Sequence, residues 1–202
     1  MAVRLLTVEG LIGAGKSSQV QMLRDRLGDD VVILEEPVEK WMESGLLQGF
    51  YNGELSAPTF QMAVLVSLFG PLISAVLRKP KLIISERSPF SNAGVFAKAN
   101  LQGAELSAYL YTLKELMAAL PEIKVTSVYL ELSVETAMQR VRHRDRDTES
   151  AISQDYMQLL HDLHDRLDGS LPEGSQFVRI DAEGGKEDTL EALMQVVDRV
   201  MA

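Results

Sequence analysis

The stretch GLIGAGKS, residues 10–17, decides the fold of this chain. It follows a short apolar run, VRLLTV (3–8), and a helix-like segment begins near Lys16. Glycines between a strand and a helix let backbone N–H groups turn inward around phosphate oxygens, while the lysine adds positive charge and the serine hydroxyl can meet Mg²⁺. The alternative is a glycine-rich turn that binds nothing. The residues that we expect to hold phosphate are Gly10, Gly13, Ala14, Gly15, Lys16, Ser17 and Ser18.

Four more β-rich apolar runs follow the first one, and helix-like segments separate them. They lie at 31–35, 81–85, 126–130 and 177–180. Runs that are continuously apolar are typical of parallel strands with helices on both faces. We therefore predict a three-layer α/β fold with a five-stranded parallel sheet, in one domain that spans 1–202. Polar residues follow every run, and ligands bind at the carboxyl ends of such strands, so we expect one cleft there.

The composition narrows the class of protein. A net charge of −9 argues against broad nucleic-acid binding, because proteins that neutralise a phosphate backbone carry a basic surface. The chain has no cysteine, which excludes a thiolate metal site and a disulfide framework. The N-terminal apolar stretch is too short for a signal peptide, and the longest apolar tract, 62–77, is too short for a bilayer. We expect a cytoplasmic protein with no membrane partner, and a kinked core helix at 62–77.

The ends of the later strands decide between the classes of phosphate-loop protein, because GTPases, ATPases and small-molecule kinases share the loop. The chain lacks the Asn-Lys-x-Asp signature with which GTPases usually read guanine. It has a carboxylate pair, Glu35-Glu36, the triplet ERS (86–88), and four arginines in RVRHRDR (140–146). Guanidinium groups match phosphate oxygens, so this cluster indicates phosphate binding; a solvated basic patch is the alternative.

Read together, these motifs resemble the deoxyribonucleoside kinase family over nearly the whole chain. The resemblance is carried by the phosphate loop, EPVEKW (36–41), FQ (60–61), ERS (86–88), an RxxxRxR pattern that starts at Arg140, and ID (180–181). It implies a P-loop kinase fold with an arginine-rich lid at 140–150. It also implies transfer of the γ-phosphate of ATP, with Mg²⁺, to the 5′-hydroxyl of a deoxynucleoside.

The resemblance assigns roles to the charged residues. Glu36 is the expected general base, held in extended geometry by the proline that follows it, with Glu35 the less favoured neighbour. Arg87 is expected to pair with Glu36, and Glu86 to meet Mg²⁺ beside Ser17. An ordinary buried salt bridge and a surface glutamate before a turn are the alternatives. The expected catalytic residues are Glu36, Arg87, Lys16, Arg140, Arg144 and Arg146, and the expected metal ligands are Ser17 and Glu86.

The resemblance also implies the substrate pocket. Gln61 matches a glutamine that bonds the base edge, and Tyr51 and Glu149 match a pair that holds the 3′-hydroxyl. Leu68 and Asn92 stand where purine-accepting members carry arginine and aspartate, which favours thymidine and deoxycytidine, although Asn92 could also meet a purine. The remaining expected pocket residues are Trp41, Phe60, Val64, Phe90 and Phe96, for which core packing is the alternative. Asp181 and the loop after it are expected to contact the adenine of ATP.

Several alternatives remain open. A nucleoside monophosphate kinase of the thymidylate type shares the loop and the lid, but it usually has EPG and DR where this chain has EPV (36–38) and ER (86–87). A non-catalytic nucleotide-binding module is the third possibility. The family resemblance implies a homodimer to which the helix at 105–120, with its apolar stripe, contributes; buried core is the alternative. His161 and His164 lack a clear third metal ligand nearby in the sequence and are interpreted as structural.

Overall fold

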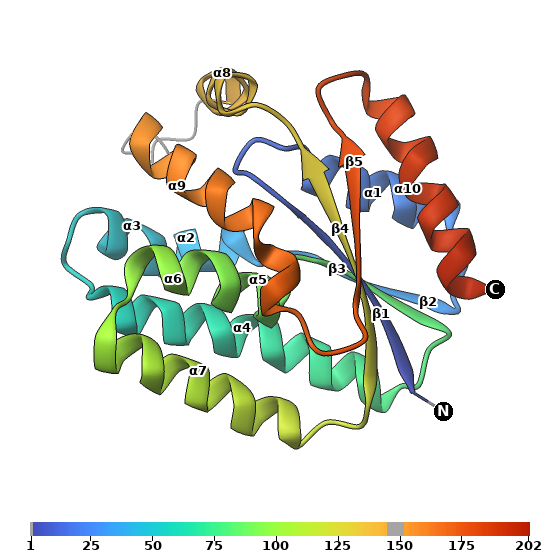
Figure 1. Cartoon of the computed structure of the whole chain (residues 1–202), viewed down its shortest axis with the longest axis horizontal. Helices are drawn as coiled ribbons and strands as arrows, with labels where there is room; N and C mark the ends of the chain where they lie inside the picture. Colours follow the sequence, from blue (N-terminus) through green and yellow to red (C-terminus); the bar gives the residue numbers. More distant parts are fainter. Residues whose placement is uncertain (1, 145–151) are drawn as a thin grey trace.

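The computed structural model of the chain describes residues 2–144 and 152–202, and it contains a twisted parallel sheet flanked by helices (Figure 1). The strands are β1 (Val3–Gly10), β2 (Val31–Leu34), β3 (Leu82–Glu86), β4 (Ile123–Glu131) and β5 (Gln176–Asp181). They form one five-stranded sheet in the order β2-β3-β1-β4-β5, and every neighbouring pair is parallel. The central position of β1 brings the phosphate loop to the middle of the carboxyl edge.

Helices connect the strands and cover the sheet. They are α1 (Lys16–Arg26), α2 (Val38–Glu43), α3 (Leu46–Tyr51), α4 (Ala57–Leu77), α5 (Pro89–Ser91), α6 (Lys98–Asn100), α7 (Gly103–Ala118), α8 (Val134–Arg144), α9 (Gln154–Asp165) and α10 (Lys186–Met201). A π-helical turn, η1 (Asn92–Ala97), follows α5, and a 3₁₀ turn, η3 (Leu167–Ser170), follows α9. Figure 1 shows α1 and α10 on one side of the sheet and α4 and α7 on the other.

Alternate residues of the central strand enter different parts of the core, as the period of a β-strand requires. Leu6 belongs to the cluster that contains Val20 of α1 and Leu193 of α10. Leu5 belongs to a second cluster, which contains Leu72 and Val76 of α4. The sheet is therefore buried on both faces, which explains why its strands read as continuous apolar runs.

The predicted fold class is confirmed, and each of the five predicted strands is present. The largest difference is at β4, which begins at Ile123, three residues before the predicted start. Lys124 interrupts the apolar pattern there, but Ile123 and Lys124 pair with Val3 and Arg4 of β1. The start of this strand is therefore set by backbone pairing with β1 rather than by the hydrophobicity of its side chains.

Helix α4 contains the long apolar tract at 62–77. Within the described part of the chain it is the one helix whose length and composition would allow it to cross a membrane, and half of the relevant window is buried inside the protein. Its Leu65 packs with Tyr109 and Leu113 of α7. The helix continues through Pro71. It is thus a core helix, as predicted, and the predicted kink stays a prediction.

Candidate active site

The phosphate loop joins β1 to α1 through backbone conformations that glycine adopts most easily. Gly13 has a φ of +90° and Gly15 a φ of +86°, both in the left-handed region. A Cβ atom at Gly13 would also lie 2.7 Å from the carbonyl oxygen of Ala137 in α8. The loop is therefore packed tightly against α8, with the N-terminus of α1 directly behind it.

Lys16 is held inside this loop. Its buried Nζ donates to the carbonyl oxygens of Leu11, at 2.9 Å, and Gly10, at 3.3 Å. Burial, together with the nearby Arg87 guanidinium, lowers the pKa of Lys16 from 10.5 to about 8. Phosphate oxygens would stabilise the charged form, because opposite charges nearby raise the pKa of an ammonium group.

Ser17 and Glu86 present oxygen atoms side by side. The Ser17 hydroxyl donates to Oε1 of Glu86, the last residue of β3, at 2.7 Å. Burial raises the pKa of the Glu86 carboxyl, and the charge of Lys16 opposes that shift. A hydroxyl beside a carboxylate is a donor set that Mg²⁺ accepts, and a cation there would offset the burial of the carboxylate. These two residues fit the metal that the sequence implies.

Glu36 lies two residues beyond the end of β2, in contact with Arg87. Its Oε1 is 2.9 Å from Arg87 Nε, and the two side chains are 15% and 3% exposed. The Nε–H forms no well-aligned hydrogen bond, so the contact is an ion pair held by charge. The structure thus places Glu36, the expected base, and Arg87, its expected partner, together in a partly buried site.

Arg87 itself is held by a constrained turn. Its φ is +61°, which is uncommon for any residue other than glycine, and its backbone N–H donates to Val8 at 3.1 Å. Ser88 and Ser91 form a capping box directly after it, and the Ser88 hydroxyl donates to Glu9 at 3.0 Å. Glu9 is fully buried, and burial raises its pKa. Such outliers cluster at functional sites, where surrounding bonds maintain them.

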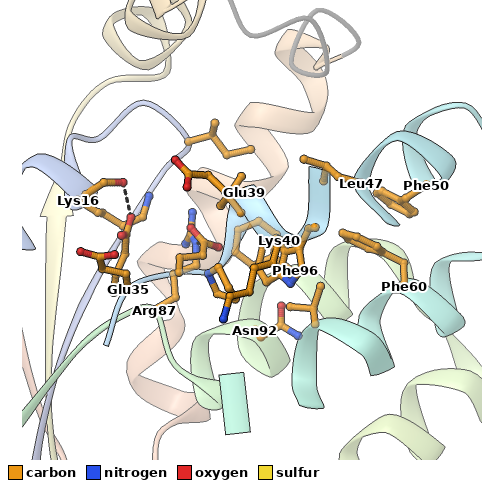
Figure 2. Close-up of a pocket in the computed structure, with 18 of the residues that line it drawn as sticks. Lys16, Glu35, Glu39, Lys40, Leu47, Phe50, Phe60, Arg87, Asn92 and Phe96 are labelled. Carbon is orange, nitrogen blue, oxygen red and sulfur yellow. Dashed lines mark hydrogen bonds and ion pairs between the residues drawn. The ribbon is translucent and has the colours of Figure 1, made fainter. Parts of the chain in front are cut away.

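A cavity of about 470 Å³ joins the phosphate loop to these charged residues. Figure 2 shows Lys16 and Glu35 towards one end of it and Phe50 and Phe60 towards the other, with Arg87 between. The predicted site residues that line it are Gly13, Lys16, Ser17, Glu36, Trp41, Tyr51, Phe60, Gln61, Val64, Glu86, Arg87, Asn92, Phe96 and Arg144. Gly15 and Ser18 line a second hollow beside the loop, together with Arg144.

Aromatic rings build the far end of the cavity. Phe50 stacks on Phe60, with ring centroids 4.3 Å apart and planes 7° from parallel. Trp41 meets Phe60 edge-on, and its Nε1 donates to the Ser67 hydroxyl at 3.0 Å. Gln61 is 2% exposed, and its Oε1 has no partner within the described residues. This end therefore offers an apolar wall and one unused amide oxygen, which is a site for a flat polar ligand.

Asn92 lies beside this end of the cavity, on the π-helical turn η1. Its side chain is buried, and Nδ2 donates to the Tyr109 hydroxyl of α7 at 2.6 Å. Burial raises the pKa of Tyr109, so the phenol stays protonated. π-helical turns occur frequently at functional sites, where they redirect a side chain. Here the turn sets Asn92 between the cavity and α7.

Six expected residues lie away from both hollows. Phe90 packs with Leu5 and Val125 in the core under the sheet, because the single turn α5 directs it there. Leu68 packs behind Trp41 in the apolar cluster of α4. Gly10 and Ala14 form the floor of the loop, where a Cβ at Gly10 would lie 2.9 Å from that of Ala14.

The other two, Arg140 and Asp181, face the loop after β5. Arg140 Nη2 donates to the carbonyl oxygens of Ala182 and Glu183, at 3.0 and 3.3 Å. Asp181 is exposed and accepts from the Glu183 N–H at 2.8 Å. Of the two expected lid arginines within the described residues, Arg144 lines the cavity and Arg140 does not. The expected site residues Arg146 and Glu149 lie outside the described residues.

Sequence reasoning missed several residues near the cavity, and three of them bear on the chemistry of the site. Phe50 carried a weak signal, because it precedes the expected Tyr51. Tyr156 of α9 lines the cavity and bonds Asn100 at 2.9 Å, but its position after the lid carried no motif. His164 was interpreted as structural, and its ring lies against Arg87, with Nε2 3.5 Å from Nη1. Helix α9 packs against η1 and β1, and this packing brings Tyr156 to the cavity and His164 to Arg87.

Comparisons with known proteins identify the family and the fold. A family model described as deoxynucleoside kinase matches residues 6–202. The thymidine kinase of Ictalurid herpesvirus 1 is 31% identical over 200 residues, covering 95% of this chain and 85% of the relative. The probable deoxycytidine kinase of fowlpox virus is 32% identical over 168 residues, covering 80% and 70%. The solved structure of deoxyadenosine kinase from M. mycoides, 22% identical, superposes with a TM-score of 0.78 over 96% of this chain and 99% of that chain.

Proposed function

The chain belongs to the deoxynucleoside kinase family, and we propose from this that it transfers the γ-phosphate of ATP to the 5′-hydroxyl of a deoxyribonucleoside, as a step of nucleotide salvage. One observation carries the proposal: a single cavity is lined by the phosphate loop, by the Glu36–Arg87 pair, and by an aromatic end with an unused amide. Donor, base and acceptor pocket are thus contiguous.

Glu36 acts as the general base. Its carboxylate accepts the proton of the 5′-hydroxyl while that oxygen forms a bond to the γ-phosphorus. The bond from the γ-phosphorus to the β,γ-bridging oxygen breaks, so ADP leaves and the proton remains on Glu36. The ion pair with Arg87 orients the carboxylate before the transfer. Little covalent chemistry is required of the protein, because positioning and charge supply most of the catalysis.

The loop and the proposed lid stabilise the negative charge of the phosphates. Lys16 and the backbone N–H groups of the loop hold the phosphate chain, and Arg144 reaches the same cavity from α8. Ser17 and Glu86 would hold Mg²⁺, which neutralises negative charge on the phosphate oxygens when bound. Arg140 and Arg146 belong to the same proposed lid, with Arg140 brought inward when the lid closes over ATP.

The aromatic end selects the base. Gln61 offers its amide to the base edge, Phe60 forms a wall, and Val64 leaves the floor apolar. We expect thymidine and deoxycytidine to be preferred, because neither of the purine-reading charges that the family resemblance implies is present at Leu68 and Asn92. Initial rates with all four deoxynucleosides under saturating Mg-ATP test this preference. Faster turnover of deoxyadenosine or deoxyguanosine would contradict it.

A direct assay separates this function from its rivals. ADP release is measured with thymidine, with deoxycytidine and with thymidine monophosphate as acceptors. The proposed function predicts turnover with a nucleoside. Turnover with the monophosphate alone would identify a thymidylate-type kinase, and ATP binding without turnover of any deoxynucleoside would identify a non-catalytic module.

A homodimer and a cytoplasmic location complete the proposal. Val66 on α4 and Tyr111 on α7 are 61% and 66% exposed, and the two helices pack side by side. Two copies that joined these faces would bury large apolar side chains that one copy leaves in water. The cytoplasm fits because the donor, ATP, is an intracellular metabolite.

A further inference from the structure

His164 occupies a buried place behind the catalytic arginine. It lies in the last turn of α9 and has no exposed surface. Its ring stacks on Tyr129 of β4, with centroids 5.4 Å apart and planes 11° from parallel, and Phe96 meets it edge-on at 6.2 Å. Two aromatic neighbours therefore fix the plane of the imidazole, so the directions of its two nitrogens are set by packing.

The hydrogen bonds of the ring identify its tautomer. Nδ1 lies 2.7 Å from the carbonyl oxygen of Leu160, and because a carbonyl can only accept, Nδ1 carries the hydrogen. Nε2 lies 3.5 Å from Arg87 Nη1, which is always a donor. A neutral ring with its lone pair on Nε2 satisfies both neighbours. Burial and the charge of Arg87 lower the pKa of His164 well below its ordinary value, and Lys16 and His161 act in the same direction.

The Arg87 guanidinium meets three groups. Phe96 lies under its plane, with the central carbon 4.5 Å from the ring centroid. Glu36 contacts Nε through charge, without a well-aligned hydrogen bond. A ring under the plane and a point charge at one edge leave rotation within the plane unrestrained. The acceptor on His164 removes this freedom, because it fixes the direction of Nη1 and therefore that of Nε on the opposite edge.

We propose that His164 is a positioning residue for phosphoryl transfer: it accepts from Arg87 and so aims the guanidinium at Glu36. The chain of contacts runs from the Leu160 carbonyl to His164, from His164 to Arg87, and from Arg87 to the general base, Glu36. This inference rests on the proposed function, in which Glu36 receives the proton of the 5′-hydroxyl. It gives α9 a part in the site that the sequence pattern of that helix does not indicate.

Two substitutions separate the effect of the Nε2 acceptor from the effect of the ring packing of His164. His164→Gln keeps an acceptor at the position of Nε2, whereas His164→Asn keeps a donor at the position of Nδ1 and loses the acceptor. Both lose the stacked ring, so their difference isolates the contact with Arg87. We expect His164→Asn to lower kcat about 10-fold with KM for ATP unchanged, and His164→Gln to recover most of that loss. His161→Asn, on the same helix and away from Arg87, is the matched control and should leave kcat unchanged.

A double-mutant cycle tests the route through the base. In a Glu36→Gln background, the added effect of His164→Asn should fall below about twofold, because the aim of Arg87 no longer matters once the base is gone. Equal effects of His164→Asn in both backgrounds, or equal losses for the asparagine and glutamine variants, would overturn the proposal. A similar fall in melting temperature for both variants with unequal kcat would support it.

Nitrogen NMR of the free protein tests the geometry without relying on activity. At pH 7 the His164 signals should show a protonated Nδ1 and an unprotonated Nε2, and the Nε2 signal should move in Arg87→Met. A protonated Nε2, or an Nε2 signal that does not shift in Arg87→Met, would overturn the inference even if the enzyme is active. Absence of deoxynucleoside turnover would instead overturn the proposed function, while this readout still reports on the contact.

Discussion

Glu35 and Glu36 are adjacent in the sequence, but the structure places their carboxylates in different surroundings. Glu36 pairs with buried Arg87, whereas the Glu35 carboxylate pairs with Arg24 on the surface, where its side chain is 52% exposed. Surface pairs contribute little, and their charges are screened by salt. Only the inner carboxylate has the fixed geometry that proton transfer requires.

We therefore expect Glu36→Gln to lower kcat by about 10² or more while nucleotide binding stays largely intact, because the amide cannot accept the proton. Initial rates and ATP titrations measure the two effects. Glu35→Gln is the matched control and should stay within about threefold of the natural protein, since its partner lies at the surface. A kcat that hardly changes in Glu36→Gln would remove Glu36 from the role of base.

Lys16 gives the site a dependence on pH. In the free protein its pKa is lowered to about 8, so a growing fraction of Lys16 is neutral above that value. A bound triphosphate favours the charged form and raises the pKa. Binding should therefore take up protons at and above pH 8, and Mg-ATP affinity should fall as pH rises beyond 8.

Calorimetry of Mg-ATP binding in buffers with different ionisation enthalpies measures this uptake. We expect about half a proton per site at pH 8 and about a tenth at pH 7, as a pKa near 8 requires. Lys16→Arg stays charged throughout and should show no uptake in this range. Equal heats in all buffers at pH 8 would contradict the lowered pKa.

The phosphate loop packs closely against α8. Gly13 and Gly15 both have positive φ, but their surroundings differ: a Cβ at Gly13 would meet the Ala137 carbonyl of α8, whereas a Cβ at Gly15 would meet no atom within 4 Å. The helix that carries the proposed lid residues Arg140 and Arg144 therefore packs directly on Gly13, where a larger residue would not fit.

Gly15→Ala should destabilise the protein by about 1–2 kcal/mol, which is the strain of the left-handed conformation. Gly13→Ala should cost clearly more, since α8 must also move away. Urea denaturation without nucleotide measures both free energies of unfolding. If the two variants are equally stable, the close approach of α8 does not constrain the loop.

The face formed by α4 and α7 sets the expected assembly at the scale of the whole molecule. The apolar stripe predicted at 105–120 is mostly internal, because Leu106, Leu113 and Met117 pack within the chain. Leu110 of the stripe is exposed, as is its neighbour Tyr111, and α4 adds the exposed residues Val66 and Leu77. Contiguous exposed apolar surface marks an interaction site, and on this ground we take the pair α4 and α7 as the candidate dimer face.

We expect the protein to sediment at twice its mass of 22.4 kDa at micromolar concentration. The double variant Val66→Glu with Tyr111→Glu should sediment as a monomer, because it would bury four unpaired charges per dimer. Leu159→Glu, on α9 and 42% exposed, is the matched control and should leave the assembly intact. A natural protein that sediments as a monomer would refute the homodimer.

The amino-acid sequence by itself determined the layers of the fold, the five strands and the phosphate loop, because apolar runs and glycine spacing are local properties that survive without knowledge of contacts. It also indicated the family, since its motifs keep their order along the chain. The tertiary structure alone decided which residues meet. Phe90 points into the core, Arg140 bonds the loop after β5, and His164 reaches Arg87 across 77 residues. Side-chain direction and long-range contact depend on how helices pack on the sheet, and no local pattern contains that information.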